Sequence, residues 1–136
     1  MLDVELARSV MKNVTTQAEM ETLRVYEAER GRVAFTITVP PTAANYHGAV
    51  HGGFLATLME IAAGMVGTSL GVNNVALSSS VNFIKLAPLG KLVVRAEAIH
   101  AGRSTVVARC RVETPEKLLC TEATFTLFVL PPKDNA

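Results

Sequence analysis

The segment 47–66, HGAVHGGFLATLMEIAAGMV, constrains the fold more than any other part of this chain. The residues from about Gly52 to Leu70, which begin inside this segment and continue past it, favour a helix that is apolar on almost every side. Gly71 is suited to end this helix. A helix of this kind must be covered on all sides. Within it only Glu60 carries a charge, and burying an unpaired carboxylate costs roughly several kcal/mol. We therefore expect Glu60 to have either a structural partner or a chemical task.

Short segments on both sides of this helix have the character of β-strands. The predicted strands span Thr22–Glu29, Arg32–Val39, Val75–Leu86, Lys91–Ala101, Ser104–Glu113 and Lys117–Leu130. In the second of them apolar residues alternate with small or polar ones, as expected when one face of a strand is covered. An antiparallel sheet can cover one side of the helix, and a second copy of the molecule would cover the rest. The order of elements thus predicts an α+β fold and a homodimer.

The whole chain, 1–136, is predicted to form a single domain. Residues 1–20 are expected to form an amphipathic N-terminal helix, and 131–136, which begin with two prolines, a flexible tail. The side of this helix that would face the core carries Leu6, Ala7, Val10, Met11 and Val14. We expect neither a signal peptide nor a membrane span, and a cytoplasmic location.

Composition narrows the range of partners. The net charge is +1, which gives no reason to expect binding to nucleic acid or to a membrane surface. Apolar residues make up 49% of the chain and charged ones 18%, so part of the apolar surface is expected between subunits. Cys110 and Cys120 lack metal-ligand spacing and could lie opposite one another as unpaired thiols on neighbouring strands. With only three histidines, we expect no metal site.

Small residues surround Glu60 on the predicted helix. Those within about 60° of it on a helical wheel are Gly53, Ala56, Thr57, Ala63, Gly64 and Gly67. This stripe lets another helix approach the backbone closely, or forms the wall of a narrow substrate tunnel. The alternative is a structural carboxylate that is paired with a buried Arg or Lys or that caps a partner helix.

Val50-His51-Gly52-Gly53 lead into the same helix. Amides at a helix N-terminus are unsatisfied and partly positive, so they suit a developing oxyanion, although a Gly-Gly start can also be only a tight turn. Glu60 lies eight residues beyond Gly52, about 12 Å along the axis. The two groups can act on one carbonyl only if two helices run antiparallel across a twofold axis. A site that uses both should therefore be shared between subunits.

Asn45, then His51-Gly52-Gly53, then an acid nine positions after the histidine resembles the hotdog-fold thioesterases of the PaaI-like and 4-hydroxybenzoyl-CoA thioesterase group. The segments VNFIKLAPLG (81–90) and IHAGRSTVVARCRV (99–112) look like that family's strand, turn and hairpin, and the resemblance covers about 33–130. It implies a hotdog fold, a long central helix wrapped by a strongly curved antiparallel sheet. It also implies dimers with a continuous sheet, which could pair into tetramers, and an active site at the dimer interface.

The activity implied by the resemblance is hydrolysis of an acyl- or aryl-CoA thioester to a free acid and CoA. No separate cofactor is expected, because coenzyme A is part of the substrate. Glu60 occupies the catalytic acid position, as general base or as nucleophile. Gly52 would polarise the carbonyl through its N–H, and Asn45 would orient the water or the carbonyl from the partner chain. His51 and Gly53 would shape the loop or bind substrate.

Several positions depart from the family pattern. Gly64 and Ala76 stand where a helping Ser or Thr is often found. Ser78 and Ser80, on the same face of the predicted strand as Ala76, are possible substitutes, and Leu86 replaces a usual proline. For the coenzyme phosphates, the predicted turn at Arg103-Ser104 offers a guanidinium and a hydroxyl, unless it is only a solvated hairpin turn. Other basic candidates are Lys85, Lys91 and Arg95.

Two other functions stay open at this stage. One is a non-catalytic acyl-CoA-binding regulator, which would normally carry an added DNA-binding segment; the residues before the first strand are few and not basic. The other is a hotdog enoyl-CoA hydratase or dehydratase, which pairs a histidine with an acid; here only His47 and His51 are near the motif.

Overall fold

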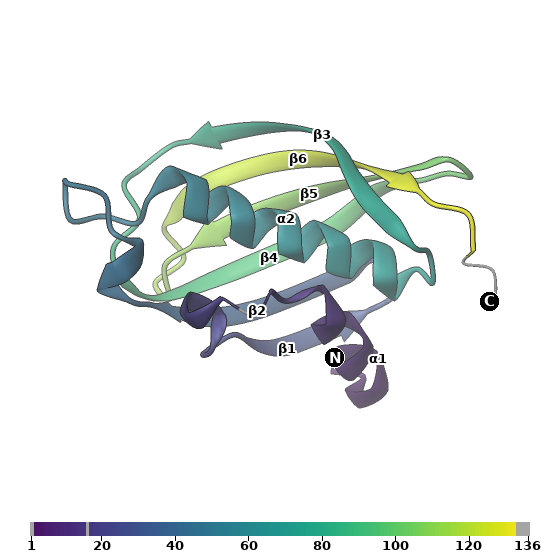
Figure 1. Ribbon diagram of the computed structural model, residues 1–136, viewed down its shortest axis with the longest axis horizontal. Helices are drawn as coiled ribbons and strands as arrows, with labels where there is room; N and C mark the ends of the chain where they lie inside the picture. Colours follow the sequence, from purple (N-terminus) through teal and green to yellow (C-terminus); the bar gives the residue numbers. More distant parts are fainter. Residues whose placement is uncertain (1, 16, 133–136) are drawn as a thin grey trace.

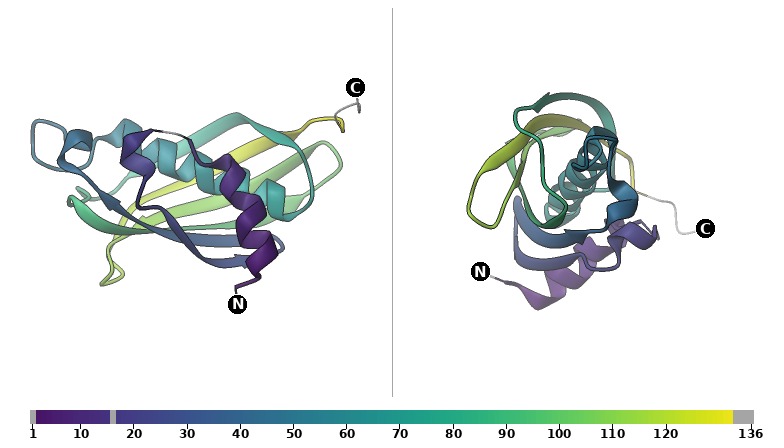
Figure 2. Two further views of the ribbon diagram at one scale, coloured as in Figure 1. Left: turned by 60° about the horizontal axis from the view of Figure 1, so that its bottom comes forward. Right: turned by 90° about the vertical axis from the view of Figure 1, so that its left-hand side faces the viewer.

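The structure, a computed structural model, describes residues 2–15 and 17–132. Its elements are α1 (Val4–Val10), the 3-10 turns η1 (Met11–Asn13) and η2 (Ala18–Met20), β1 (Arg24–Glu29), β2 (Arg32–Val39), the 3-10 turn η3 (Pro41–Ala43), α2 (Gly52–Ser69), β3 (Asn74–Phe83), β4 (Gly90–Ala101), β5 (Thr105–Glu113) and β6 (Leu119–Val129). The strands form one antiparallel sheet in the order β1-β2-β4-β5-β6-β3. The sheet curls around α2, as the end-on view in Figure 2 shows. The predicted α+β hotdog architecture is confirmed.

The long helix α2 lies in the concave face of the sheet (Figure 1). Leu58, Met59 and Val66 are completely buried there, and they pack with Phe35 and Ile37 of β2 in a single core cluster. Burial of such side chains is the main stabilising contribution to a fold of this kind, about 1.5–3 kcal/mol for each. The helix is nevertheless not covered all round, because the side that carries Glu60 is exposed in the single chain.

Most predicted strand boundaries agree with the structure. The range of β2 is as predicted, and the other strands begin or end within three residues of the expected positions. The strand β3 stops at Phe83 rather than Leu86, because the amides of Ile84 and Lys85 both donate to the Cys120 carbonyl and so end the regular ladder. The β1–β2 and β4–β5 connections are tight turns, as expected.

The prediction of one N-terminal helix over 1–20 is wrong in its length. The helix α1 ends at Val10, and the Val14 amide donates to Met11 in η1 rather than to Val10. The Asn13 side chain donates to the Val10 carbonyl at 3.1 Å and so takes the acceptor that another helical turn would need. Val10 is nonetheless fully buried, and Leu6 and Val14 pack against the core, as expected, but Met11, predicted on the same side, is exposed. The tail predicted for 131–136 lies outside the described residues from 133 on.

The two cysteines are buried and unpaired, but they do not lie opposite one another. Cys110 of β5 is opposite Ala123, and Cys120 is near the irregular end of the β5–β6 pair. Burial raises the pKa of the Cys110 thiol to about 12. Among the helices that the structure describes, none has the length and hydropathy required to cross a bilayer.

Candidate active site

The start of α2 leaves one amide without an acceptor. The Gly53 N–H donates to Nδ1 of His51 at 3.4 Å, and the amides of Phe54 and Leu55 donate to the His51 carbonyl. The His51 side chain is thus the N-cap of the helix, on an extended backbone with ψ 133°. Within residues 2–15 and 17–132, the Gly52 N–H has no hydrogen-bond partner. It is therefore the amide at this terminus that remains able to bind an oxyanion.

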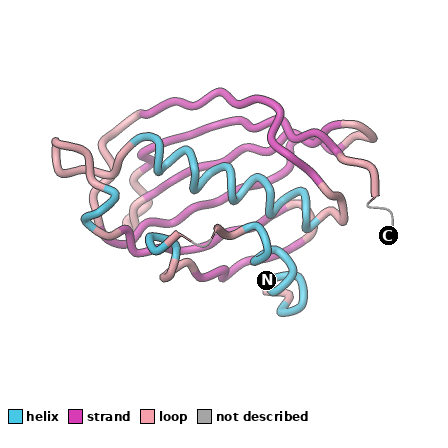
Figure 3. The backbone as a smooth tube through the Cα atoms, in the orientation of Figure 1, coloured by secondary structure: helices cyan, strands magenta, loops and turns pink. Residues whose placement is uncertain are grey.

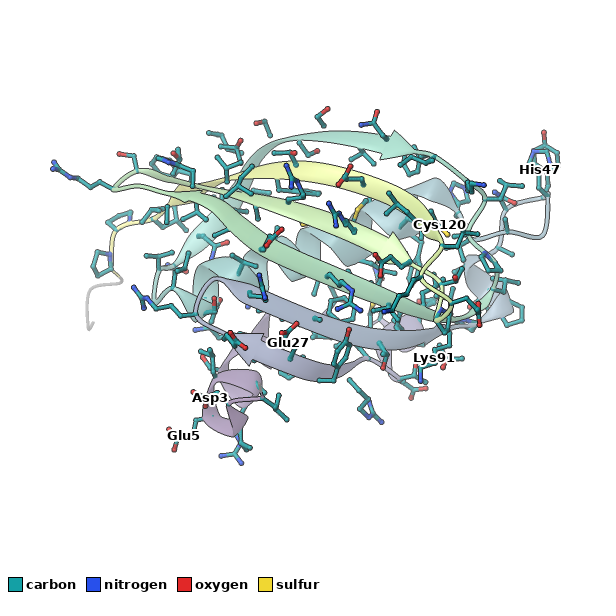
Figure 4. All side chains as sticks on the ribbon, turned by 180° about the vertical axis from the view of Figure 1, so that it is seen from behind. Asp3, Glu5, Glu27, His47, Lys91 and Cys120 are labelled. Atoms are coloured by element: carbon teal, nitrogen blue, oxygen red, sulfur yellow. The ribbon has the colours of Figure 1, made fainter. Side chains whose placement is uncertain are left out.

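The loop before α2 is organised by Asn45. Its side-chain oxygen accepts from the His47 N–H at 2.9 Å and from the Ala49 N–H at 3.2 Å. The backbone N–H of Asn45 donates to the Ala49 carbonyl. This Asx-type turn fixes the conformation of a short loop that extends beyond the end of the sheet (Figure 3), with His47 at its tip (Figure 4). Both side-chain hydrogen bonds use the oxygen of Asn45, so its Nδ2 group can donate to another molecule. The geometry is compatible with the predicted role of orienting a carbonyl or a water.

Glu60 faces an open cleft of about 220 Å³. The cleft is lined by Asn13, Thr15, Thr57, Glu60, Ile61, Gly64, Asn74, Val75, Ala76 and Leu127. In the described part of the chain no Lys or Arg forms an ion pair with this carboxylate. The structural ion pair considered as an alternative is thus not observed in the described residues. Glu60 is exposed in the single chain, so the expectation of a buried carboxylate is wrong there.

The stripe of small residues next to Glu60 is partly filled by the chain itself. A Cβ on Gly64 would meet the Asn13 side-chain oxygen at 2.9 Å, and a Cβ on Gly67 would overlap the Asn74 amide. Close approach to the helix backbone was expected from another helix or from a substrate tunnel. At Gly64 and Gly67 the approaching groups are instead the side chains of two asparagines. Nothing in the sequence marked these two asparagines as neighbours of the helix. The residues nearer to Gly52 remain uncovered.

Glu60 and the Gly52 N–H are not brought together in one chain. They lie on the same straight helix, eight residues and hence about 12 Å apart along the axis. Phe83, at the end of β3, lies against the helix start, where a Cβ on Gly52 would meet its ring at 3.3 Å. This aromatic neighbour of Gly52 was also not anticipated from the sequence.

A β-bulge decides which serines of β3 face the helix. Ala76 is opposite the buried Leu127, but the register shifts between Ala76 and Ser78. Beyond the bulge Ser79 is opposite the buried Phe125, whereas Ser78 and Ser80 are opposite Thr126 and Thr124. Since directly paired residues share a face, Ser78 and Ser80 point away from α2, and Ser79 points toward it. The suggested substitutes for the helping hydroxyl are thus on the wrong face.

The turn with Arg103 and Ser104 lies at the far end of the molecule from Gly52. The Ser104 carbonyl accepts from Val129, which is paired with Asn74 just beyond the end of α2. Both turn residues are exposed.

The other basic candidates are placed elsewhere. Arg95 is on the outer face of the sheet, 3.1 Å from Glu113. Lys85 follows β3, close to the start of α2, where the Ala87 carbonyl accepts from Val50. Lys91 is exposed near the start of β4 (Figure 4). Across the residues that the structure describes, no cluster of His, Cys, Asp or Glu side chains could hold a metal ion.

A long helix wrapped by a curved antiparallel sheet is the hotdog architecture. The family model of the thioesterase superfamily matches residues 47–121, more than half of the chain. The chain belongs to the thioesterase superfamily. It is therefore an enzyme that hydrolyses thioesters, as predicted.

Solved structures give the same assignment. A hypothetical thioesterase from Streptococcus pneumoniae TIGR4, solved with coenzyme A, is 31% identical, with a TM-score of 0.84 over 93% of this chain and 98% of that one. The protein smu.793 of Streptococcus mutans UA159, bound to acetyl CoA, is 33% identical, with a TM-score of 0.80 over 89% and 98% of the two chains. The PaaI protein of E. coli, at 20% identity, shares the fold, with a TM-score of 0.83 over 94% and 98%. No curated protein matches the sequence.

Proposed function

We propose that this chain is an acyl-CoA thioesterase in which Glu60 of one subunit and the Gly52 N–H of the other act on the same thioester carbonyl. The observation that carries this proposal is the pair of unused groups on α2. The Gly52 amide lacks an acceptor in the described chain, and Glu60 lines an open cleft about 12 Å further along the helix. Two antiparallel copies of α2 would bring each acid beside the other copy's helix start.

The edge strand β3 supports such a pairing. It is at the end of the sheet and leaves one row of backbone groups unpaired. Large apolar side chains on or just beyond it expose half or more of their surface: Val75, Leu77, Phe83, Ile84 and Leu86. An exposed apolar edge of this kind is suited to a second copy, so we propose a homodimer. Further association into a tetramer stays a prediction.

The chemical step follows from these groups. Glu60 takes a proton from a water molecule, whose oxygen attacks the thioester carbon. The carbonyl oxygen becomes anionic and accepts the N–H of the partner's Gly52, helped by the positive end of that helix. Collapse breaks the C–S bond, and the proton on Glu60 passes to the sulfur. The products are a carboxylic acid and CoA with a free thiol.

Coenzyme A as the carrier of the acyl group is supported by the two streptococcal structures, which hold coenzyme A and acetyl CoA. In an antiparallel pair, the Arg103-Ser104 turn at the end of one α2 would lie on the side of the other helix's start. Arg103 could then bind a phosphate of the coenzyme. The two unpaired cysteines fit a reducing compartment, and we propose the cytoplasm.

The proposal is tested by CoA release from a panel of acyl-CoAs, followed with a thiol reagent. The Glu60→Gln variant should lose about 10²- to 10⁴-fold in kcat and keep substrate binding. Glu116→Gln, an exposed acid in the turn after β5, is the matched control and should be fully active. Absence of CoA release from the wild type, or an active Glu60→Gln variant, would overturn the proposal. An acylated Glu60 peptide after rapid quenching would instead identify Glu60 as the nucleophile.

A further inference from the structure

Asn13 and Asn74 separate two neighbouring hollows beside α2. The first hollow is the Glu60 cleft of about 220 Å³. The second, of about 460 Å³, is lined by Ser9, Lys12, Asn13, Thr68, Gly71, Val72, Asn73 and Asn74. The two asparagines line both hollows. They therefore form the boundary between them.

Hydrogen bonds hold this boundary in place from two directions. Asn13, which arrives from the N-terminal segment, donates to Thr68 Oγ1 at 2.9 Å and to the Val10 carbonyl at 3.1 Å. Asn74, at the start of β3, donates to the Gly64 carbonyl at 3.4 Å and to the Val72 carbonyl at 3.3 Å. Both side chains are partly buried. They lie close to α2 because Gly64 and Gly67 have no side chains to displace them.

The cleft between Glu60 and this boundary has mainly apolar walls. Ile61 of α2 and Ala76 and Leu127 of the sheet form its apolar side, and Thr15 and Thr57 also line it. Such walls fit an acyl chain or a ring better than the amide-containing arm of the coenzyme, whose polar groups would lose their hydrogen bonds to water there. The second hollow, in contrast, is lined mostly by polar side chains and includes Lys12.

We propose that Asn13 and Asn74 close the acyl-binding part of the Glu60 cleft and so restrict the enzyme to short acyl chains or single-ring acyl groups. This inference rests on the proposed thioesterase function. A longer chain would have to displace two hydrogen-bonded asparagines, or leave its end outside the cleft. The boundary acts on specificity, since neither residue needs to touch the thioester.

The test compares Asn13→Ala, Asn74→Ala and the double variant with the wild type on butyryl-, octanoyl- and lauroyl-CoA. The measured quantity is the ratio of kcat/KM for lauroyl-CoA to that for butyryl-CoA within one preparation. This ratio does not depend on the fraction of correctly folded enzyme. Removal of the boundary should raise it about tenfold or more in the double variant, because each methylene newly buried is worth about fourfold. Ser9→Ala, which changes only the second hollow, should leave it unchanged.

A filling variant gives the opposite result if the inference holds. Ala76→Val adds volume to the apolar wall in a residue type that strands favour, and it should lower kcat/KM for octanoyl-CoA more than for acetyl-CoA. An unchanged chain-length ratio in all the asparagine variants would overturn the inference. So would a KM that rises equally for every chain length, which would place the coenzyme arm at the boundary. A wild type inactive on every thioester would instead refute the proposed function itself.

Discussion

Nδ1 of His51 accepts the Gly53 N–H at 3.4 Å, and this contact separates the roles of two adjacent glycines. Because the Gly53 N–H is engaged by the His51 N-cap, the Gly52 N–H is the amide left at this helix start for a substrate oxygen. Gly52 is the first residue of α2, where proline is tolerated, and His51 already has the extended backbone that a following proline requires. Gly52→Pro should therefore remove this N–H without unfolding the helix, and kcat should fall about 10²- to 10³-fold.

Gly52→Ala is the matched control for that variant. It adds the same Cβ against the Phe83 ring, at 3.3 Å, but it keeps the N–H. Steady-state kinetics should show most of the activity retained in Gly52→Ala and lost in Gly52→Pro. Equal losses in both variants would mean that the contact with Phe83, rather than the hydrogen bond, is responsible.

One substitution can separate the observed role of Asn45 in holding its loop from its predicted role of orienting substrate or water. Asn45→Asp keeps a side-chain oxygen for the amides of His47 and Ala49, so the loop should stay folded. It replaces the Nδ2 donor, and the loss of that hydrogen bond to substrate or water should lower kcat/KM by about tenfold. Thermal unfolding should be near that of the wild type for Asn45→Asp and lower for Asn45→Ala. A fully active Asn45→Asp would restrict Asn45 to holding the loop.

A shared site makes complementation possible between two inactive variants. In a mixed dimer of Glu60→Gln and Gly52→Pro chains, one site would receive the intact Glu60 and the intact Gly52. Unfolding and refolding an equal mixture should restore about a quarter of the wild-type activity, since half of the dimers are mixed and each has one good site. If each site used groups of a single chain, the mixture would remain inactive. Activity after refolding thus distinguishes the two arrangements directly.

Cys110 should make the fold sensitive to alkaline pH. Burial raises the pKa of this thiol from 9.0 to about 12, so the folded state holds its proton where the unfolded state releases it. The corresponding stability is complete below pH 9 and is lost as the pH rises toward 12, by up to about 1.4 kcal/mol per pH unit. Urea unfolding at pH 8 and pH 10.5 should show this loss in the wild type and a smaller one in Cys110→Ala. An equal loss of stability in the wild type and in Cys110→Ala would mean that groups other than Cys110 cause the sensitivity to alkaline pH.

The main elements of the fold could be predicted because their patterns are local. The alternation in β2 and the continuous apolar run of α2 each indicate an element without reference to distant residues. The length of α1 could not be predicted, because it ends where the Asn13 side chain competes for the Val10 carbonyl while it also bonds to Thr68, 55 residues away. Only the folded chain brings these groups together.

The candidate site, too, could be predicted from the sequence only in part. Gly52 and Glu60 stand out by their spacing on one helix, and in the described structure the Gly52 N–H has no acceptor while Glu60 lines an open cleft. The face of the β3 serines was wrongly assigned, because strict alternation from Ala76 fails at the bulge before Ser78. A bulge inserts one residue into the ladder, and every later side chain then points to the opposite face. No glycine or proline in this stretch marks the shift.

The two edges of the sheet are unequally covered. Leu2 forms a parallel bridge with Ala28 of β1, and the Asp3 N–H donates to the Ala28 carbonyl at 3.3 Å. The chain's own beginning thus occupies part of the edge at β1, while β3 remains bare. Leu2 and Asp3 therefore protect part of the β1 edge against pairing with a strand of another molecule.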